Sequence, residues 1–326
     1  MISNGRRVAV AGTAALAFML MASSACAQNW PNRPLRLIAP FPAGGGTDLV
    51  GRTIAIKLSE ALRQPVVVEN RPGAGGTIGA DAVARAAPDG YTLGVATSST
   101  HPASVVLQAG VPYDPITSFA PVSLVAETSY VMVANPALPV TSLNEFVAYA
   151  KANPGKLNFA NVGSSTLGYL LSLQWKALTG TDLLDVSYKG SAQIYPDLMN
   201  GQLTVFLDNP GASTALVNSG KLKAFGVTRA TPSMPGVPLF SAAGMPGFNM
   251  AFWYGIVAPA GTPRPIVDRI HGEIAKYLAS AEGRADLQKF SLEPVGAPPD
   301  QFAAIIAADV ERLRTLARSL KVDTPR

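Results

Sequence analysis

The chain has 326 residues, a formal net charge of +5 from 26 Lys and Arg against 21 Asp and Glu, and a single cysteine. This length exceeds the usual single-domain size, so we expect two lobes. The basic residues are scattered and form no block, which argues against a nucleic-acid-binding stripe. One cysteine excludes a disulfide framework and a cysteine-based metal site.

Residues 1–27 have the features of an export signal. Arg6-Arg7 form a basic start, residues 8–22 are apolar and uncharged, and Ala25-Cys26-Ala27 is an Ala-x-Ala cleavage site. The apolar run is too short to be a convincing membrane span. A lipid anchor on the cysteine is the alternative, but Ser23 stands where such signals usually carry Leu. We expect cleavage after Ala27, a mature charge of +3 after the loss of two arginines, and a periplasmic protein.

The first predicted elements are a buried strand at 35–39 and an amphipathic helix with apolar residues from Leu49 to Leu62. Between them, Gly44-Gly45-Gly46 allow backbone N–H groups to approach a ligand where a Cβ would clash. Thr47 or Asp48 is expected to cap the helix, whose N-terminus offers free donors and a partial positive charge. The stretch predicts a site for a carboxylate or phosphate, with a ligand-free glycine turn as the alternative.

Strands continue to alternate with helices, which predicts a parallel sheet with helices on both faces. Strands are expected at 65–69 and 91–96, with a helix over 78–86. The glycine-rich loop before that helix lacks the third glycine of a dinucleotide fingerprint, because Ile78 stands there. The next strand runs into the hydroxyl-rich loop 97–100, at the sheet edge where ligands bind. Its hydroxyls are expected either to bind an oxyanion or to cap the next helix.

The second half repeats the pattern of strand, small-residue loop and helix. A strand at 129–134 is expected to cross into a second lobe, and Ser142 to cap a helix over 143–152. The repeated unit is a strand at 157–161, the loop Gly163-Ser164-Ser165-Thr166 and a helix over 167–179. Later strands are expected at 183–188, 204–207, 224–228 and, as the crossing back, 252–257. The sequence thus predicts two α/β lobes, each a mostly parallel sheet flanked by helices, formed by 28–128 with 254–326 and by 129–253.

Five motifs stand in order along the chain: Arg33–Asp48, Glu69–Thr77, Ala87–Thr92, Tyr188–Gly190 and Tyr254–Pro259. Together they resemble the Bug family, the extracytoplasmic solute receptors of tripartite tricarboxylate transporters, over nearly the whole mature chain. The resemblance implies a type II-like periplasmic binding protein, or Venus flytrap, that closes on a carboxylate-bearing ligand. It also implies no enzymatic activity, no cofactor and no metal, with two membrane subunits as partners.

The resemblance also implies ligand contacts from both lobes. Those of the first lobe are Phe41, Ala43, Gly44, Gly45, Gly46, Asp48, Thr97 and Ser98. Those of the second lobe are Gly163, Ser164, Ser165 and Thr166, with Asp208 near the cleft. Because these loops carry no Arg or Lys, we expect neutral donors to bind the ligand charge, with Asp48 as a cap or an organiser of waters.

One departure from the family pattern bears on the ligand. Members often place a polar residue, frequently His, shortly after the second-lobe loop, where this chain has Leu167-Gly168-Tyr169-Leu170-Leu171. The departure favours an apolar or aromatic acid such as terephthalate over a highly polar tricarboxylate. We expect a monomer that binds a di- or tricarboxylate and no nucleic acid.

Two other functions use the same residues differently. A ligand-sensing receptor for a membrane signalling partner would have the same fold. A secreted hydrolase would need a nucleophile with a base, but the histidines are His101 and His271 alone, and no G-x-S-x-G motif occurs. Asp48 and Asp208 could form a carboxylate pair, although no aromatic sugar platform accompanies them.

Overall fold

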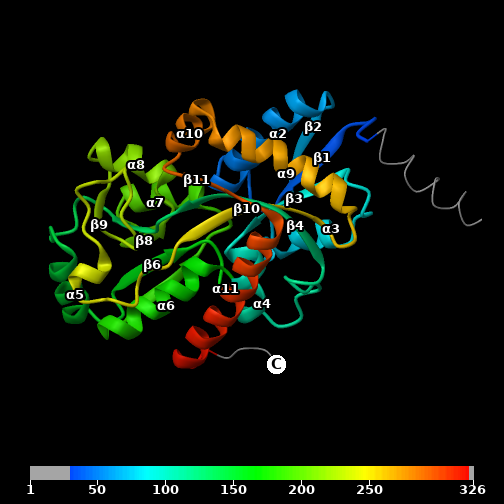
Figure 1. Cartoon of the computed structure of the whole chain (residues 1–326). Helices are drawn as coiled ribbons and strands as arrows, with labels where there is room; N and C mark the ends of the chain where they lie inside the picture. Colours follow the sequence, from blue (N-terminus) through cyan, green and yellow to red (C-terminus); the bar gives the residue numbers. More distant parts are fainter. Residues whose placement is uncertain (1–29, 323–326) are drawn as a thin grey trace, which may run out of the picture.

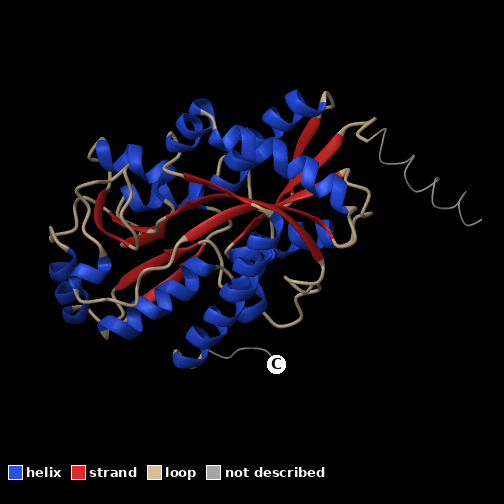
Figure 2. Cartoon of the chain, in the orientation of Figure 1, coloured by secondary structure: helices blue, strands red, loops and turns tan. Residues whose placement is uncertain are grey.

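The computed structural model describes residues 30–322, so the predicted signal sequence and its cleavage site lie outside the described residues. Two β-sheets form the centres of two lobes, and helices pack around them (Figures 1 and 2). The C-terminal helices lie against the lobe built by the N-terminal part of the chain (Figure 1). The predicted two-lobed α/β fold class is confirmed.

The first sheet has six strands in the order β11-β4-β10-β3-β1-β2. β1 pairs in parallel with β2 and β3, whereas β10 is antiparallel to β3 and β4, and β11 is antiparallel to β4. The bounds are β1 Leu35–Ala39, β2 Val66–Asn70, β3 Thr92–Thr97, β4 Phe119–Thr128, β10 Phe252–Pro259 and β11 Glu293–Ala297.

The second sheet has five strands in the order β7-β6-β8-β5-β9. β6 pairs in parallel with β7 and β8, and β5 is antiparallel to β8 and β9. The bounds are β5 Val131–Ala134, β6 Leu157–Asn161, β7 Leu183–Ser187, β8 Val205–Asp208 and β9 Lys223–Val227. Both sheets are therefore mixed and not mostly parallel, because the strands that link the lobes enter each sheet in the antiparallel direction.

Helices connect the strands of each sheet. The α-helices that follow strands of the first sheet are α2 Gly46–Leu62, α3 Thr77–Ala84, α4 Ser104–Leu107, α9 Arg264–Ala279, α10 Ala281–Gln288 and α11 Pro299–Ser319. Those of the second sheet are α5 Leu143–Ala152, α6 Leu167–Thr179, α7 Ile194–Met199 and α8 Pro210–Asn218. Short helical turns are η1 Ala74–Gly76, η2 Ser99–Ala103, η3 Ser191–Gln193 and η4 Phe240–Ala243. No helix of the described chain combines the length and apolarity needed to cross a membrane.

The chain leaves the first sheet at the end of β4 and enters the second at the start of β5, with Ser129-Tyr130 between them. It returns between β9 and β10. The Tyr130 N–H donates to Thr228 Oγ1 at 2.8 Å, so the outgoing and returning segments are hydrogen-bonded side by side. The lobe bounds expected from the sequence stay a prediction.

Each lobe has an apolar core whose residues follow the predicted periodicity. In the first lobe, Leu35 and Leu37 of β1 are fully buried. In the second, Phe146 stacks between Trp175 and Phe225, with ring centroids 5.6 and 5.2 Å away. These aromatic side chains tie α5 and α6 to β9.

Candidate functional site

The first glycine loop ends at α2, where the predicted caps are wrong. Gly45 is the N-cap and has no side chain to form a capping bond. Asp48 instead accepts hydrogen bonds from Gly44 N–H at 3.0 Å, Arg52 Nε at 3.0 Å and Asn70 Nδ2 at 2.9 Å. Burial acts to raise the pKa of Asp48, but these bonds outweigh it and hold that pKa below its usual value. Asp48 is a charged organiser of the loop.

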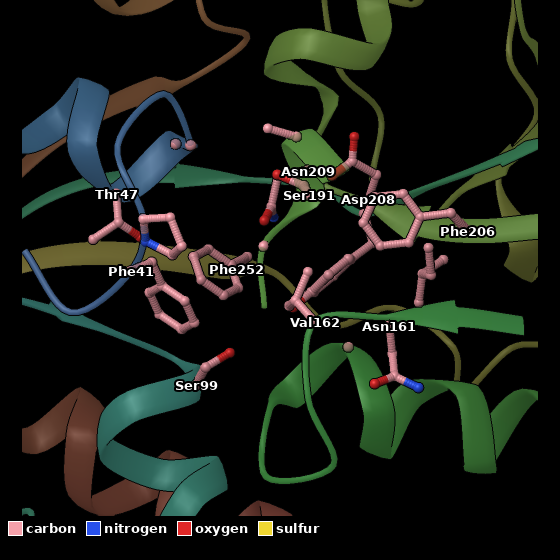
Figure 3. Close-up of a pocket in the computed structure, with 18 of the residues that line it drawn as sticks. Phe41, Thr47, Ser99, Asn161, Val162, Ser191, Phe206, Asp208, Asn209 and Phe252 are labelled. Atoms are coloured by element: carbon pink, nitrogen blue, oxygen red, sulfur yellow. The ribbon is translucent and has the colours of Figure 1, made fainter. Parts of the chain in front are cut away.

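An inner cavity of about 80 Å³ lies between the lobes. Phe41, Thr47, Ser99 and Phe252 approach it from one side, and Asn161, Val162, Ser191, Phe206, Asp208 and Asn209 from the other (Figure 3). Among the described residues, no Lys or Arg lines it. Ala43, Gly45 and Gly46, which were predicted to bind the ligand, are in its wall as well.

Aromatic rings form much of this wall. Tyr130 packs edge-on against Phe252 with centroids 5.7 Å apart, and Phe252 against Tyr254 at 4.9 Å. Both tyrosines are almost fully buried and line the inner cavity. Burial raises the pKa of Tyr130 and Tyr254 above the usual range, so both hydroxyls stay neutral donors at physiological pH.

Two asparagine side chains add donors that have no partner in the described chain. Asn161 Oδ1 accepts from Gly163 N–H at 2.9 Å and Ser187 Oγ at 2.8 Å, which fixes the amide, while its Nδ2 is buried without a hydrogen bond. Asn209 Nδ2 is also buried and unbonded. An unsatisfied buried donor of this kind costs about 1–3 kcal/mol.

Asp208, predicted to lie near the cleft, is the acidic side chain of the inner cavity and is 4% exposed. Its Oδ2 accepts a hydrogen bond from the Tyr195 hydroxyl at 2.6 Å. Burial raises the pKa of the Asp208 carboxyl to about 7, although donors around it act to lower that pKa. A smaller adjoining hollow of about 50 Å³ is lined by Asp208 together with Gly44, Gly45 and Gly46.

The second-lobe loop faces an outer cavity of about 680 Å³ that shares Phe41 and Val162 with the inner one. Gly163, Ser164 and Ser165 line this outer cavity opposite the loop Pro72–Gly76, and exposed Lys189 lies beside them. Ser165 Oγ donates to the Ala74 carbonyl at 3.4 Å, which joins the two lobes.

Three hydroxyls that were expected to bind the ligand are hydrogen-bonded to the chain itself. Thr166 Oγ1 caps α6 by accepting from Tyr169 N–H at 3.4 Å. Thr97 Oγ1 accepts from the backbone N–H groups of Ser99 and Thr100, and Ser98 Oγ from that of Trp253 at 2.8 Å. The inner cavity is lined instead by Ser99, whose Oγ accepts from Leu167 N–H across the lobes at 3.2 Å.

The apolar stretch after the second-lobe loop is mainly core. Leu167, Leu170 and Leu171 are fully buried, and of this stretch only Gly168 lines the inner cavity. Its leucines therefore do not line the inner cavity, whose apolar wall comes from the aromatic residues above. In residues 30–322, no group of three or more His, Cys, Asp or Glu side chains is placed to hold a metal ion.

Sequence reasoning missed several of the lining residues. Asn161 ends β6 and Asn209 follows β8, so the strand-end rule applied to the first lobe would have found both. Tyr130 and Tyr254 were assigned to crossing strands, and no local signal places their hydroxyls at the cavity. Two α/β lobes with a cavity of neutral donors between them define the protein as a member of the two-lobed solute-binding class.

Comparisons with known proteins identify the family. The family model of the tripartite tricarboxylate transporter family receptor, TctC, matches residues 50–322. BugT of Bordetella pertussis is 36% identical over 305 residues, which cover 91% of this chain and 92% of BugT. The periplasmic binding protein BugD superposes with a TM-score of 0.85 at 33% identity, covering 90% of this chain and 99% of BugD.

An R. palustris protein solved with adipate gives a TM-score of 0.87 at 33% identity, covering 91% of this chain and all of that one (100%). The chain therefore belongs to the tripartite tricarboxylate transporter receptor family, a family of periplasmic solute receptors. The predicted resemblance to the Bug family is confirmed.

Proposed function

We propose that the protein binds an organic carboxylate in the inner cavity and delivers it to the membrane subunits of a tripartite tricarboxylate transporter. The observation that carries the proposal is the chemistry of that cavity. Its lining includes Gly45 and Gly46 at the start of α2, the tyrosines Tyr130 and Tyr254, and the asparagines Asn161 and Asn209, whose buried Nδ2 groups have no acceptor. Neutral donors of this kind bind a carboxylate without a cation.

The ligand class we propose is a small diacid, or an acid with an apolar or aromatic body. Adipate in the R. palustris relative supports a diacid. The walls of Phe41, Phe206 and Phe252 support an apolar body between the carboxylate and the opposite end of the ligand. The inner cavity is small, so a longer ligand extends toward the outer cavity or requires the lobes to open.

Ligand entry requires separation of the lobes, because Ser165 contacts Ala74, and Ser99 contacts Leu167, across the cleft. The adjoining segments at Tyr130 and Thr228 form the hinge in this proposal. A ligand that contacts both lobes binds the closed state more tightly and shifts the population toward it.

Thermal unfolding with a panel of mono-, di- and tricarboxylates, aliphatic and aromatic, tests the proposed function. A ligand at a hundredfold excess over its Kd adds about 2.7 kcal/mol of stability. We expect at least one small diacid or aromatic acid to raise the Tm, and the corresponding amides and alcohols to leave it unchanged. A panel without any stabilising carboxylate would contradict the proposal.

A further inference from the structure

Asp208 is a carboxyl group in a cavity that we propose binds another carboxylate. Among the residues that line the inner cavity and the adjoining hollow, no Lys, Arg or His faces it, and no ion pair in the described chain includes it. Its side chain is 4% exposed, so water cannot screen it well. Two carboxylates in such surroundings repel each other strongly unless one of them is protonated.

The groups packed around Asp208 are neutral. Tyr195 of α7 donates to Oδ2 at 2.6 Å, and the tyrosines facing the carboxyl from other elements are Tyr254 of β10 and Tyr130 beside the hinge. Burial raises the pKa of all three phenols above the usual range. At the first glycine loop, the charges of Asp48 and Arg52 are paired with each other at 3.0 Å. None of these groups neutralises a second negative charge.

The opposite wall attracts a carboxylate to the same place. The hollow that Asp208 lines is bounded by Gly44, Gly45 and Gly46. Gly45 is the N-cap of α2, which has 17 residues. Backbone N–H donors and the helix field favour an anion there. Asn209 also lines the hollow beside Asp208, and its buried Nδ2 is a donor without an acceptor.

We propose that the ligand carboxylate and Asp208 share one proton in the closed cleft, so that the receptor takes up a proton when it binds its anion. The inference rests on the proposed function and adds Asp208 as a specificity-determining residue. The proton lies between one ligand oxygen and one Asp208 oxygen, and the remaining ligand oxygen accepts from the α2 N-terminus. Such a charge-assisted acid–carboxylate bond is shorter and stronger than a neutral one.

The burial described above supports this reading, because it brings the pKa of Asp208 to about 7 before any ligand arrives. The approach of a second carboxylate moves that pKa further upward. Binding near neutral pH then draws a proton from solvent, and the dissociation constant increases with pH. In the limit of one linked proton, the affinity falls by about tenfold for each pH unit above the free carboxyl's pKa.

The test is isothermal titration calorimetry of the full mature protein with adipate, in two buffers of different ionisation enthalpy, from about pH 6 to about pH 8. We expect uptake of up to one proton and weaker binding at higher pH. Asp208→Asn should lose both the uptake and the pH dependence. The matched control is Asp309→Asn, because Asp309 is a half-buried acid with a raised pKa whose Oδ2 accepts from Trp253 Nε1 at 2.7 Å, outside the inner cavity.

Each outcome of this test decides between the two proposals. Binding of adipate by the wild type without proton uptake overturns the shared proton and leaves the proposed function standing. An affinity that rises with pH, together with a preference for amino acids, also overturns it, because Asp208 would then pair with a ligand cation. If neither adipate nor any carboxylate of the panel binds, the proposed function itself fails. The wild-type measurement decides even if Asp208→Asn does not fold.

Discussion

Replacing Gly46 by alanine tests whether the first glycine loop forms the wall of the ligand site. A Cβ at Gly46 would overlap the hydroxyl of Tyr254, which is 2% exposed. The tyrosine has little freedom to move away, since β10 pairs with β3 and β4 on either side and the ring packs against Phe252 at 4.9 Å. Either the ring turns into the inner cavity or the loop is pushed outward.

Overpacking of this kind costs about 1–3 kcal/mol of folding stability. Because a ligand must force a Tyr254 ring displaced into the cavity back against the new Cβ, we expect a loss of similar size in binding. It corresponds to a roughly 5- to 150-fold increase in Kd. Intrinsic propensity works in the opposite direction, because alanine is about 1 kcal/mol more favourable than glycine inside a helix. A net loss of folding stability therefore reports the steric clash and not the change in helix propensity.

Gly272→Ala is the matched control for Gly46→Ala. Gly272 is an exposed residue of α9 outside the inner cavity, and its new Cβ would meet nothing within 4 Å. Calorimetric titration of both variants with a carboxylate that stabilises the wild type, alongside urea unfolding, separates affinity from stability. The reasoning is refuted if the two variants bind equally well, or if Gly46→Ala is the more stable one.

Further predictions concern closure, pH and export. Gly75→Ala would place a Cβ onto Ser165 Oγ of the opposite lobe, at a φ of +65° that disfavours alanine. We expect a larger radius of gyration than wild type in scattering and weaker ligand binding in calorimetric titration. Saturating ligand should reduce the radius of gyration of the wild type, and an unchanged value would mean a rigid or permanently closed cleft. Because the pKa of folded Asp208 is raised from 3.8 to about 7, the folded state holds a proton that the unfolded state has lost. The free energy of unfolding of the wild type, relative to Asp208→Asn, should therefore be highest below pH 3.8 and fall as pH rises from there to about 7. A difference in urea unfolding that does not change with pH would contradict this. Intact mass of periplasmic material should correspond to a chain that begins at Gln28, and a lipid adduct or an uncut chain would show this wrong.

Elements set by local sequence could be predicted closely. The bounds of α5 and α6 match the predicted helices, because Ser142 accepts from Glu145 N–H and Gly180 ends α6 in a left-handed conformation. β1 and β6 were equally clear, since each is a short apolar run bounded by turn residues. These signals lie within a few residues of the element that they define.

β4 could not be predicted in the same way. It runs from Phe119 to Thr128 in the middle of a sheet, and most of its side chains are buried on both faces. A strand buried on both faces lacks polar–apolar alternation, and Pro121 argues locally against a strand. The same long-range pairing turned the expected mostly parallel sheets into mixed ones.

The site residues likewise include some that local sequence predicts and others that depend on tertiary packing. Strand ends and glycine loops pointed to Gly45, Gly46 and Asp208, all of which line the cavity between the lobes. Loop chemistry alone could not distinguish a hydroxyl that bonds its own backbone, such as Thr97, from one that faces the cavity, such as Ser99. That distinction depends on the tertiary packing of β3, β10 and the opposite lobe.

The crystal structure of the mature protein with a stabilising carboxylate is the most direct test of the central claim, that neutral donors in the inner cavity bind the ligand. We predict a ligand carboxylate within about 2.7–3.2 Å of backbone N–H groups at Gly45 or Gly46 and of a donor from the opposite lobe, either Asn161 or Asn209. A carboxylate held by Lys189 in the outer cavity, with the inner cavity free of ligand, would contradict the account.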